Sequence, residues 1–415
     1  VAGRQRGEWL VPRVGSRIWN KRSGGPITLG TDCTGLGSTP ESLASLTDDW
    51  QYVFASEIDE VARYHLERNF NGVKFSGDVR ARPADQDKHV DLYVAGFPCQ
   101  PFSAIGLKQG EEDVRGRGSI LPRIFQYIFN AKPKTFILEN VSNFARMDSG
   151  RLLERTLAEL RKNGLYYVSH IMVDPRTLGV PQSRIRLFIV GVRSDFCTAD
   201  FDSRLDATGI EPLHQYLDDD RRHDDYDSLP KTAQDNVDWA WTQLTGDTED
   251  LHDEWILYCD ASVQFRVLRR GCSPCLTYSR DKGLWLMKRK RRMSAAEVMR
   301  LQGLSLCRNI TETDKEVRRL CGNSRCVRVI SCVISRLFAC LDGVFFDSVA
   351  QEKKPGTPVP APPGPQVTDV LLPAAGPADE VSAPCALSDS EDSITSTCNT
   401  LSIKPLHSSK RDVRK

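Results

Sequence analysis

The sequence of 415 residues lacks any uninterrupted apolar run of the roughly 18 to 20 residues that a membrane helix needs. Its most apolar stretch, VRVISCVISRLFACLDGVFF, is broken by Arg328, Arg336 and Asp342, and its spacing is typical of an amphipathic helix. A charge excess is lacking too, because the formal net charge is only +1. We therefore expect no membrane contact, and any attraction to nucleic acid must come from local clusters.

Cysteines are present but lack a pairing rhythm. Thirteen of them, an odd number, are scattered along the chain, which favours a reducing compartment with free thiols. Cys272 and Cys275 have the spacing of zinc ligands, but no second such pair follows at zinc-finger distance. We expect a plain loop there and no metal site.

Composition divides the chain into five segments. Residues 1–25 are basic and glycine-rich, as in a flexible arm, and residues 26–192 alternate apolar with amphipathic stretches, the pattern of an α/β domain with a mostly parallel sheet. Residues 193–267 are rich in aspartate and indicate a separate small region. Residues 268–346 are basic and structured, and residues 347–415 have the Pro/Ser-rich composition of a disordered tail.

Hydrophobic periodicity places the elements of the α/β domain. Apolar runs predict strands over residues 26–33, 50–57, 90–97, 134–141 and 185–192. Helical spacing predicts helices over residues 40–46, 60–70, 119–131 and 151–164.

Polar residues after the first strands indicate a nucleoside cofactor. The turn TDCTGLGS, residues 31–38, precedes a helix and would let a ligand lie against main-chain N–H groups, although such glycines also make ordinary turns. Glu57 follows Gly37 by about 20 residues, a position suited to ribose hydroxyls, and Asp78 follows at the next strand edge. A GxxxxGKS loop is lacking, which argues against a nucleoside triphosphate.

Three further polar features accompany the later strands. Cys99 follows one strand, Glu139 lies at the end of another, and Arg184 and Arg186 adjoin a third. Singly they read as a core cysteine, a loop charge and surface arginines. On one edge of a sheet they would combine a nucleophile, a proton-carrying carboxylate and anion-binding guanidiniums.

The motifs and their order resemble the cytosine-C5 DNA methyltransferase family, which uses S-adenosylmethionine. The resemblance covers residues 27–346 and rests on DCTGLGS, SEIDE, GDVR, GFPCQPFS, GSILPRIFQYI, ENV, QSRIRLFIVGVR, RRMSAAEVMRLQGL and GNSRCVRVI. It implies a Rossmann-like methyltransferase domain, a small target recognition domain and DNA as the partner.

The resemblance also implies residue roles. Cys99 would attack C6 of a flipped cytosine, Glu139 would hydrogen-bond the base, and Arg184 and Arg186 would hold it. The cofactor-binding residues implied are Cys33, Thr34, Gly35, Leu36, Gly37, Glu57, Ile58, Asp78, Val79, Pro98, Asn323 and Ser324. The substrate-binding residues implied are Gln100, Ser103, Arg115, Arg117 and Asn140, in part on a mobile catalytic loop. Arg292, Glu297, Arg300 and Gln302 resemble a structural brace.

Four positions depart from the family pattern. Cys33 stands where a phenylalanine usually packs on the cofactor adenine, and Ser38 where a second glycine is common. Arg325 and Arg328 replace more usual apolar and small residues. The recognition region is also acidic, so either local basic pieces or an accessory protein would supply the DNA contacts.

Three questions stay open at this stage. The run KRKRR, residues 288–292, would grip phosphate, act as a nuclear import signal or form a solvated turn; with the tail it predicts a nuclear location. The tRNA-methylating branch of the fold is an alternative substrate class, although it typically carries PPC where this chain has Phe97-Pro98-Cys99. A catalytically weak DNA-binding scaffold is the third reading, although such members usually lose the PC dipeptide or the ENV glutamate.

Overall fold

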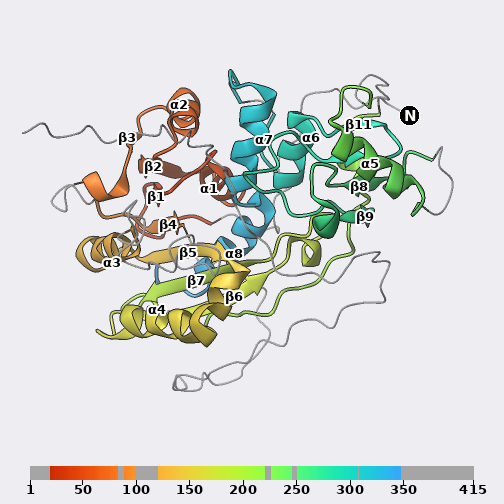
Figure 1. Cartoon of the computed structure of the whole chain (residues 1–415). Helices are drawn as coiled ribbons and strands as arrows, with labels where there is room; N and C mark the ends of the chain where they lie inside the picture. The colour runs from red at the N-terminus through yellow and green to blue at the C-terminus, as the bar shows by residue number, and fades with distance from the viewer. Residues whose placement is uncertain are drawn as a thin grey trace, which may run out of the picture.

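A seven-stranded sheet forms the centre of the chain in the computed structural model, which describes residues 19–82, 88–98, 120–219, 226–244, 250–306 and 308–346. The strand order is β3-β2-β1-β4-β5-β7-β6 (Figure 1). The strands are β1 (Ile27–Asp32), β2 (Trp50–Ser56), β3 (Lys74–Ser76), β4 (Leu92–Gly96), β5 (Thr135–Val141), β6 (Tyr166–Val173) and β7 (Arg186–Arg193). All neighbours pair in parallel except β7, which runs antiparallel to both β5 and β6.

The mostly parallel α/β fold is thereby confirmed. The five strands and four helices expected from periodicity are present, the helices being α1 (Ser38–Ala44), α2 (Glu60–Asn69), α3 (Ile120–Ala131) and α4 (Arg151–Arg161). Strands β3 and β6 were not expected. Because β7 is reversed, the residues just before it lie at the same edge as the carboxyl ends of β1, β4 and β5.

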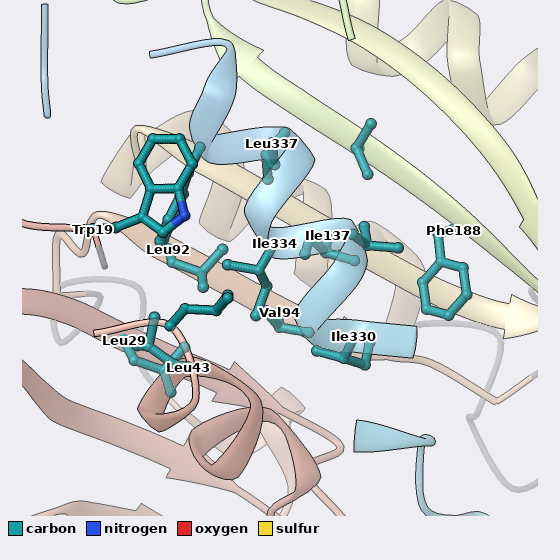
Figure 2. Packing of buried hydrophobic residues seen from close by; sticks show 14 of the residues in the cluster. Trp19, Leu29, Leu43, Leu92, Val94, Ile137, Phe188, Ile330, Ile334 and Leu337 are labelled. Atoms are coloured by element: carbon teal, nitrogen blue, oxygen red, sulfur yellow. The ribbon is translucent and has the colours of Figure 1, made fainter. Parts of the chain in front are cut away.

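Helices α1 and α8 (Val327–Ala339) cover one face of the sheet (Figure 2). Leu29, Leu92 and Ile137 of three adjacent strands meet Ile330 and Ile334 of α8 in one buried cluster. Alternate side chains of the same strands pack on α3 and α4 on the opposite face. The sequences of its strands are therefore almost continuously apolar, since both faces of the sheet are buried.

The described part of the folded domain begins at Trp19, within the segment that was expected to be a flexible arm. The Trp19 side chain is buried in the α8 cluster, against the rings of Phe338 and Phe346. Its main-chain N–H donates to the carbonyl of Leu46, and Lys21 forms an ion pair with Asp91 at 2.8 Å. Residues 19–25 thus belong to the folded domain, which corrects the boundary drawn at 25. Residues 1–18 lie outside the described part.

A second, four-stranded sheet of order β11-β10-β8-β9 belongs to the recognition region. It is formed by β8 (Trp255–Leu257), β9 (Leu268–Arg270), β10 (Trp285–Leu286) and β11 (Arg291–Arg292), with α5 (Lys231–Trp241) packed against it. The sheet crosses the boundary drawn at 267. Helices α6 (Ala295–Gln302) and α7 (Asp314–Asn323) then lead back to α8 (Figure 1). No helix among the described residues is both long and apolar enough to cross a bilayer.

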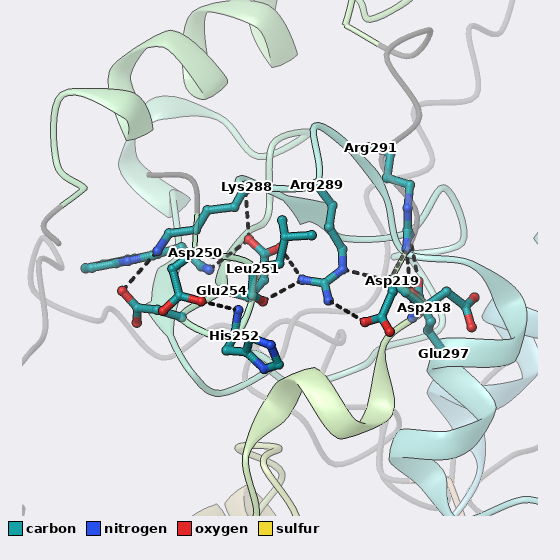
Figure 3. Close-up of polar contacts among 12 residues, drawn as sticks. Asp218, Asp219, Asp250, Leu251, His252, Glu254, Lys288, Arg289, Arg291 and Glu297 are labelled. Carbon is teal, nitrogen blue, oxygen red and sulfur yellow. Dashed lines mark hydrogen bonds and ion pairs between the residues drawn. The ribbon is translucent and has the colours of Figure 1, made fainter. Parts of the chain in front are cut away.

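Most of the basic run, residues 288–292, is folded inward, which does not fit a solvated turn or a surface that grips phosphate. Lys288, Arg289 and Arg291 are buried (Figure 3). Arg289 Nη1 lies 2.9 Å from the buried Glu254 carboxylate, and Lys288 Nζ lies 3.0 Å from Asp253. Carboxylates of the recognition region thus neutralise the run from within. These basic side chains are committed to ion pairs inside the fold, since a buried charge needs such partners.

Candidate active site

The turn after β1 is shaped for close approach of a ligand. Gly35 and Gly37 adopt left-handed φ values of 64° and 77°, a region that disfavours side chains. Glu57, just after β2, accepts hydrogen bonds from the N–H groups of Gly35 at 2.7 Å and Asp59 at 2.9 Å. Burial raises the pKa of the Glu57 carboxyl, while these two hydrogen bonds oppose that shift.

The end of α7 forms the other wall of this turn. A Cβ at Gly35 would lie 3.7 Å from Ser324 Oγ and 3.9 Å from the carbonyl of Asn323. Gly35 and Ser324 are nearly three hundred positions apart in the sequence, so the contact joins the two ends of the folded domain. Asn323 and Ser324 therefore lie beside the glycine turn, where the resemblance places them.

The remaining residues expected at the cofactor have mixed surroundings. Ile58 is 66% exposed beside Glu57, so an apolar side chain is available to a planar ring. The carboxylate of Asp78 pairs with Arg80 and caps a short helix, and this hydrogen bonding lowers its pKa. The side chains of Thr34, Leu36 and Val79 are buried in the fold.

Cys33 follows β1 with a left-handed φ of 50°. Burial raises the pKa of its thiol, and Glu57 and Asp32 add to the shift. A thiol held protonated is a weak nucleophile, so Cys33 offers packing surface rather than reactivity.

Glu139 lies in a pocket with two guanidinium groups. Arg186 Nε is 3.5 Å from Glu139 Oε1, and Arg325 Nε is 3.5 Å from Glu139 Oε2. The pocket is lined by Glu139, Pro175, Arg184, Arg186, Phe188, Arg325, Cys326 and Val329. Sequence reasoning placed Glu139 and Arg186 together but had no role for Arg325, whose replacement of an apolar residue was the only signal.

Arg184 has a role different from the one expected. Its side chain is buried, and its Nη2 donates to the carbonyls of Gly322 and Ser324, each at 2.9 Å. Its Nη1 donates to the carbonyl of Leu276. Both terminal nitrogens are thus bound to main chain, so in this structure Arg184 braces the pocket wall and does not present them to a base. Cys275 lies 3.7 Å from Arg184 Nη1, which places the CSPC loop on the same wall.

Asn140 holds the chain that leads to Cys99. Its Nδ2 donates to the carbonyl of Phe97 at 3.1 Å, and its Oδ1 accepts from the N–H of Val141. Both ends of the amide are used within the protein, so Asn140 positions the segment before Pro98 rather than the expected substrate. The other residues expected here, Cys99, Gln100, Ser103, Arg115 and Arg117, lie outside the described residues.

A buried ion pair that the sequence did not predict lies at the end of β1, just before the glycine turn. Asp32, the last residue of β1, accepts from Arg82 Nη1 at 2.6 Å and Nη2 at 2.9 Å. It also accepts from Ser56 and from the hydroxyl of Tyr93. The Arg82 guanidinium stacks 4.7 Å from the Phe54 ring centroid. An aspartate at a strand end carried the only signal.

The four brace residues connect the recognition sheet to the catalytic domain. Arg292 pairs with Asp260 at 2.7 Å, and Arg300 pairs with Asp218 at 2.6 Å. Glu297 closes a capping box with Ser294 at the start of α6. Gln302 Nε2 donates to the carbonyls of Cys321 and Ser324. These contacts end at the same loop that borders Gly35.

The residues of this edge fit a nucleoside cofactor beside a reaction pocket. The glycine turn follows β1, Glu57 and the exposed Ile58 follow β2, and Glu139 ends β5, on the other side of β4. The buried Nε of Arg325 has no hydrogen bond to any described residue. Such a donor set suits an adenosine at the turn and an anion or polar group near Glu139.

Comparisons with known proteins agree with this geometry. The family described as C-5 cytosine-specific DNA methylase matches residues 33–339. Type II methyltransferase M.NlaX of Neisseria lactamica is 31% identical over 75% of this chain and 96% of its own length. M.NgoBI of Neisseria gonorrhoeae is 33% identical over 67% and 83%. The structure of the Entamoeba histolytica methyltransferase EhMeth is 18% identical with a TM-score of 0.56, covering 76% of this chain and 99% of that one, and thus shares its fold.

Proposed function

This chain belongs to the C-5 cytosine-specific DNA methylase family, and we propose that it methylates cytosine in DNA through a covalent bond from Cys99, with S-adenosylmethionine as methyl donor. The observation that carries the proposal is the pocket at Glu139. A carboxylate able to hydrogen-bond a base lies across the end of β4 from a glycine turn suited to adenosine.

The residues of the chain account for each requirement of the reaction. Gly35, Glu57, Ile58 and Asn323 would hold the cofactor, which when bound supplies the methyl group as a sulfonium electrophile. The Cys99 thiolate forms a bond to C6 of the flipped cytosine, and the electron pair of the C5–C6 bond makes C5 nucleophilic. Glu139 hydrogen-bonds the base edge and offsets charge that develops on the ring. Loss of the C5 proton to solvent and cleavage of the C6–sulfur bond then release Cys99.

One hydrogen bond of the structure supports the assignment of positions. Asn140 ties the chain just before Pro98 and Cys99 to β5, the strand that carries Glu139. The strand that carries Glu139 is therefore joined by a side-chain hydrogen bond to Phe97, two residues before Cys99 in the sequence. Such coupling favours the fixed geometry that addition to C6 requires.

Covalent trapping tests the proposal. Duplex DNA containing 5-fluorocytosine is incubated with S-adenosylmethionine and the wild type, Cys99→Ser or Cys197→Ser, and then run on a denaturing gel. Fluorine at C5 blocks the final elimination, so we expect a shifted band for wild type and for the control Cys197→Ser, whose site is remote from the pocket. Absence of the band in all three proteins, or its persistence in Cys99→Ser, would contradict the mechanism.

The same gel with fluorinated tRNA tests the alternative substrate class. A band with tRNA alone would transfer the activity to RNA, and no band with either would favour the scaffold reading. A nuclear location and an accessory DNA-binding protein stay predictions. The basic run offered as an import signal is buried, and the Neisseria relatives are bacterial proteins, so neither supports the nuclear assignment.

A further inference from the structure

Arg325 connects the cofactor turn to the base pocket through one side chain. Its Nη2 donates to the carbonyl of Cys33 at 3.2 Å, and its Nε lies 3.5 Å from Glu139 Oε2. The side chain crosses the end of β4, where a Cβ on Gly96 would lie 2.0 Å from Nη2. Only a glycine at position 96 leaves room for the guanidinium.

Arginines outnumber carboxylates among the described residues that line this pocket. Three arginines, Arg184, Arg186 and Arg325, line it with one carboxylate, Glu139, among the described residues. Arg325 is only 5% exposed, and its Nε makes no hydrogen bond to the described part of the chain. A guanidinium removed from water is stabilised by anionic partners. Arg325 Nε is therefore a buried donor that an anionic ligand would satisfy.

We propose that Arg325 binds the α-carboxylate of the methyl donor and so extends the cofactor site toward Glu139. The inference rests on the proposed use of S-adenosylmethionine, an adenosine joined to an amino acid. With the adenosine end at the glycine turn, the amino-acid end is the part that reaches toward the base pocket. Arg325 directly follows Asn323 and Ser324, the residues that form the wall of that turn.

A DNA phosphate is the other anion available to this site. It fits less well, because the guanidinium contacts the carbonyl of Cys33 on the cofactor side. Planar, bidentate pairing with a carboxylate is the geometry that arginine favours. The site therefore selects the smaller anion carried by the cofactor itself.

Calorimetry with two ligands separates these sources, in the absence of DNA. S-adenosylhomocysteine carries the carboxylate, whereas 5′-methylthioadenosine keeps the adenosine and sulfur but lacks the amino acid. For Arg325→Met we expect the Kd of S-adenosylhomocysteine to rise about 10- to 100-fold, as for a lost charged hydrogen bond. The Kd of 5′-methylthioadenosine should stay within about twofold. Arg325→Lys should show a smaller loss, because it keeps the charge but not the paired geometry.

Arg328→Met is the matched control, since Arg328 lies three residues after Arg325, at the start of α8, but pairs with Glu211. It should leave both Kd values unchanged. A second measurement uses the methyl ester of S-adenosylhomocysteine, which should bind wild type more weakly than the free acid but bind Arg325→Met equally. The difference in Kd between the ester and the free acid can be measured in wild type even if Arg325→Met fails to fold.

Each outcome decides the proposal. Equal weakening of both ligands in Arg325→Met would show a structural role and overturn it. Unchanged binding of S-adenosylhomocysteine, with weaker DNA binding instead, would assign the site to phosphate and also overturn it. Wild type that binds neither adenosyl ligand would overturn the proposed cofactor, and this inference with it.

Discussion

The side-chain amide of Asn140 donates to the main-chain carbonyl of Phe97, 3.1 Å away, and so joins the strand that carries Glu139 to the chain that leads to Cys99. Both ends of the Asn140 amide make hydrogen bonds within the protein, and the bond to Phe97 holds the chain at that residue. Its contribution is therefore to geometry, on which the rate of a covalent addition depends strongly.

Replacing Asn140 with alanine should slow methylation without weakening cofactor binding. We expect kcat to fall about 10- to 100-fold, because small displacements of a reacting group carry penalties of this size. The Kd of S-adenosylhomocysteine should stay unchanged, since the amide contacts Phe97 and not the glycine turn. Asn69→Ala removes a comparable amide bonded to the carbonyls of His65 and Asn309 and serves as control. An unchanged kcat would contradict the positioning role.

The buried pair of Asp32 and Arg82 should be a major stabilising element of the sheet edge. Arg82→Met removes the cation but leaves Asp32 fully buried beside Tyr93. Breaking a buried pair from one side typically costs about 3–5 kcal/mol of unfolding free energy. Urea titration measures it. Arg204→Met, which breaks the exposed pair with Asp202, should show no measurable change, and equal losses in both variants would refute the argument.

Cofactor affinity should weaken as the pH falls, because of Glu57. Burial raises the pKa of this carboxyl, so it takes up a proton at a higher pH than an ordinary glutamate. The carboxylate is the form that accepts from Gly35 and would accept from a ribose, so protonation removes the acceptor. Calorimetry from about pH 8 to about pH 5 should show a rising Kd for S-adenosylhomocysteine.

Glu57→Gln is the test of that assignment. It should bind more weakly at high pH and show a flat profile, since the amide does not titrate. Glu316→Gln, at the start of α7, removes a carboxyl whose pKa is lowered by its cap hydrogen bonds and should keep the wild-type profile. A pH profile that survives in Glu57→Gln would assign the titration to another group.

Local sequence signals predicted the strands that are apolar on both sides. Strand β4, residues 92–96, carries no charge, because both faces of the sheet are covered. Strand β6 was not predicted, because Tyr167 is exposed and Ser169 and His170 interrupt its apolar character. Strand β3 is only three residues long. The reversal of β7 depends on pairing with β5 and β6, which no local pattern records.

Site residues that belong to a sequence motif could be assigned from the sequence. Contacts between residues far apart in the sequence could not. Glu139 could be assigned from its motif, but Arg325 acts on Cys33 across 292 positions of sequence. Its departure from the family pattern marked it as unusual without saying what it touches. Arg184 was assigned to a base because a motif records residue type and not the main-chain carbonyls that bind it.

The basic run should resist trypsin although it contains five consecutive cleavage sites. Lys288, Arg289 and Arg291 are buried, and cleavage requires an accessible, extended chain. We expect early cuts at exposed sites such as Arg204, with bonds at residues 288–292 cut only as the domain opens. Mass spectrometry of a timed digest follows both. Rapid cleavage of the run in folded wild type would restore the reading of an accessible signal.

Glu254→Gln should open this run, because it removes the charge that faces Arg289 at 2.9 Å. Removing one partner of a buried ion pair is expected to cost up to about 3–5 kcal/mol, which raises the population of the open form and the cleavage rate at residues 288–292. Asp235→Asn, which breaks the exposed pair with Lys231, should leave the digest unchanged. Equal digests for the two variants would mean that the acidic residues of the recognition region do not keep the basic run folded. Those acidic residues would then have another role, such as contact with an accessory protein.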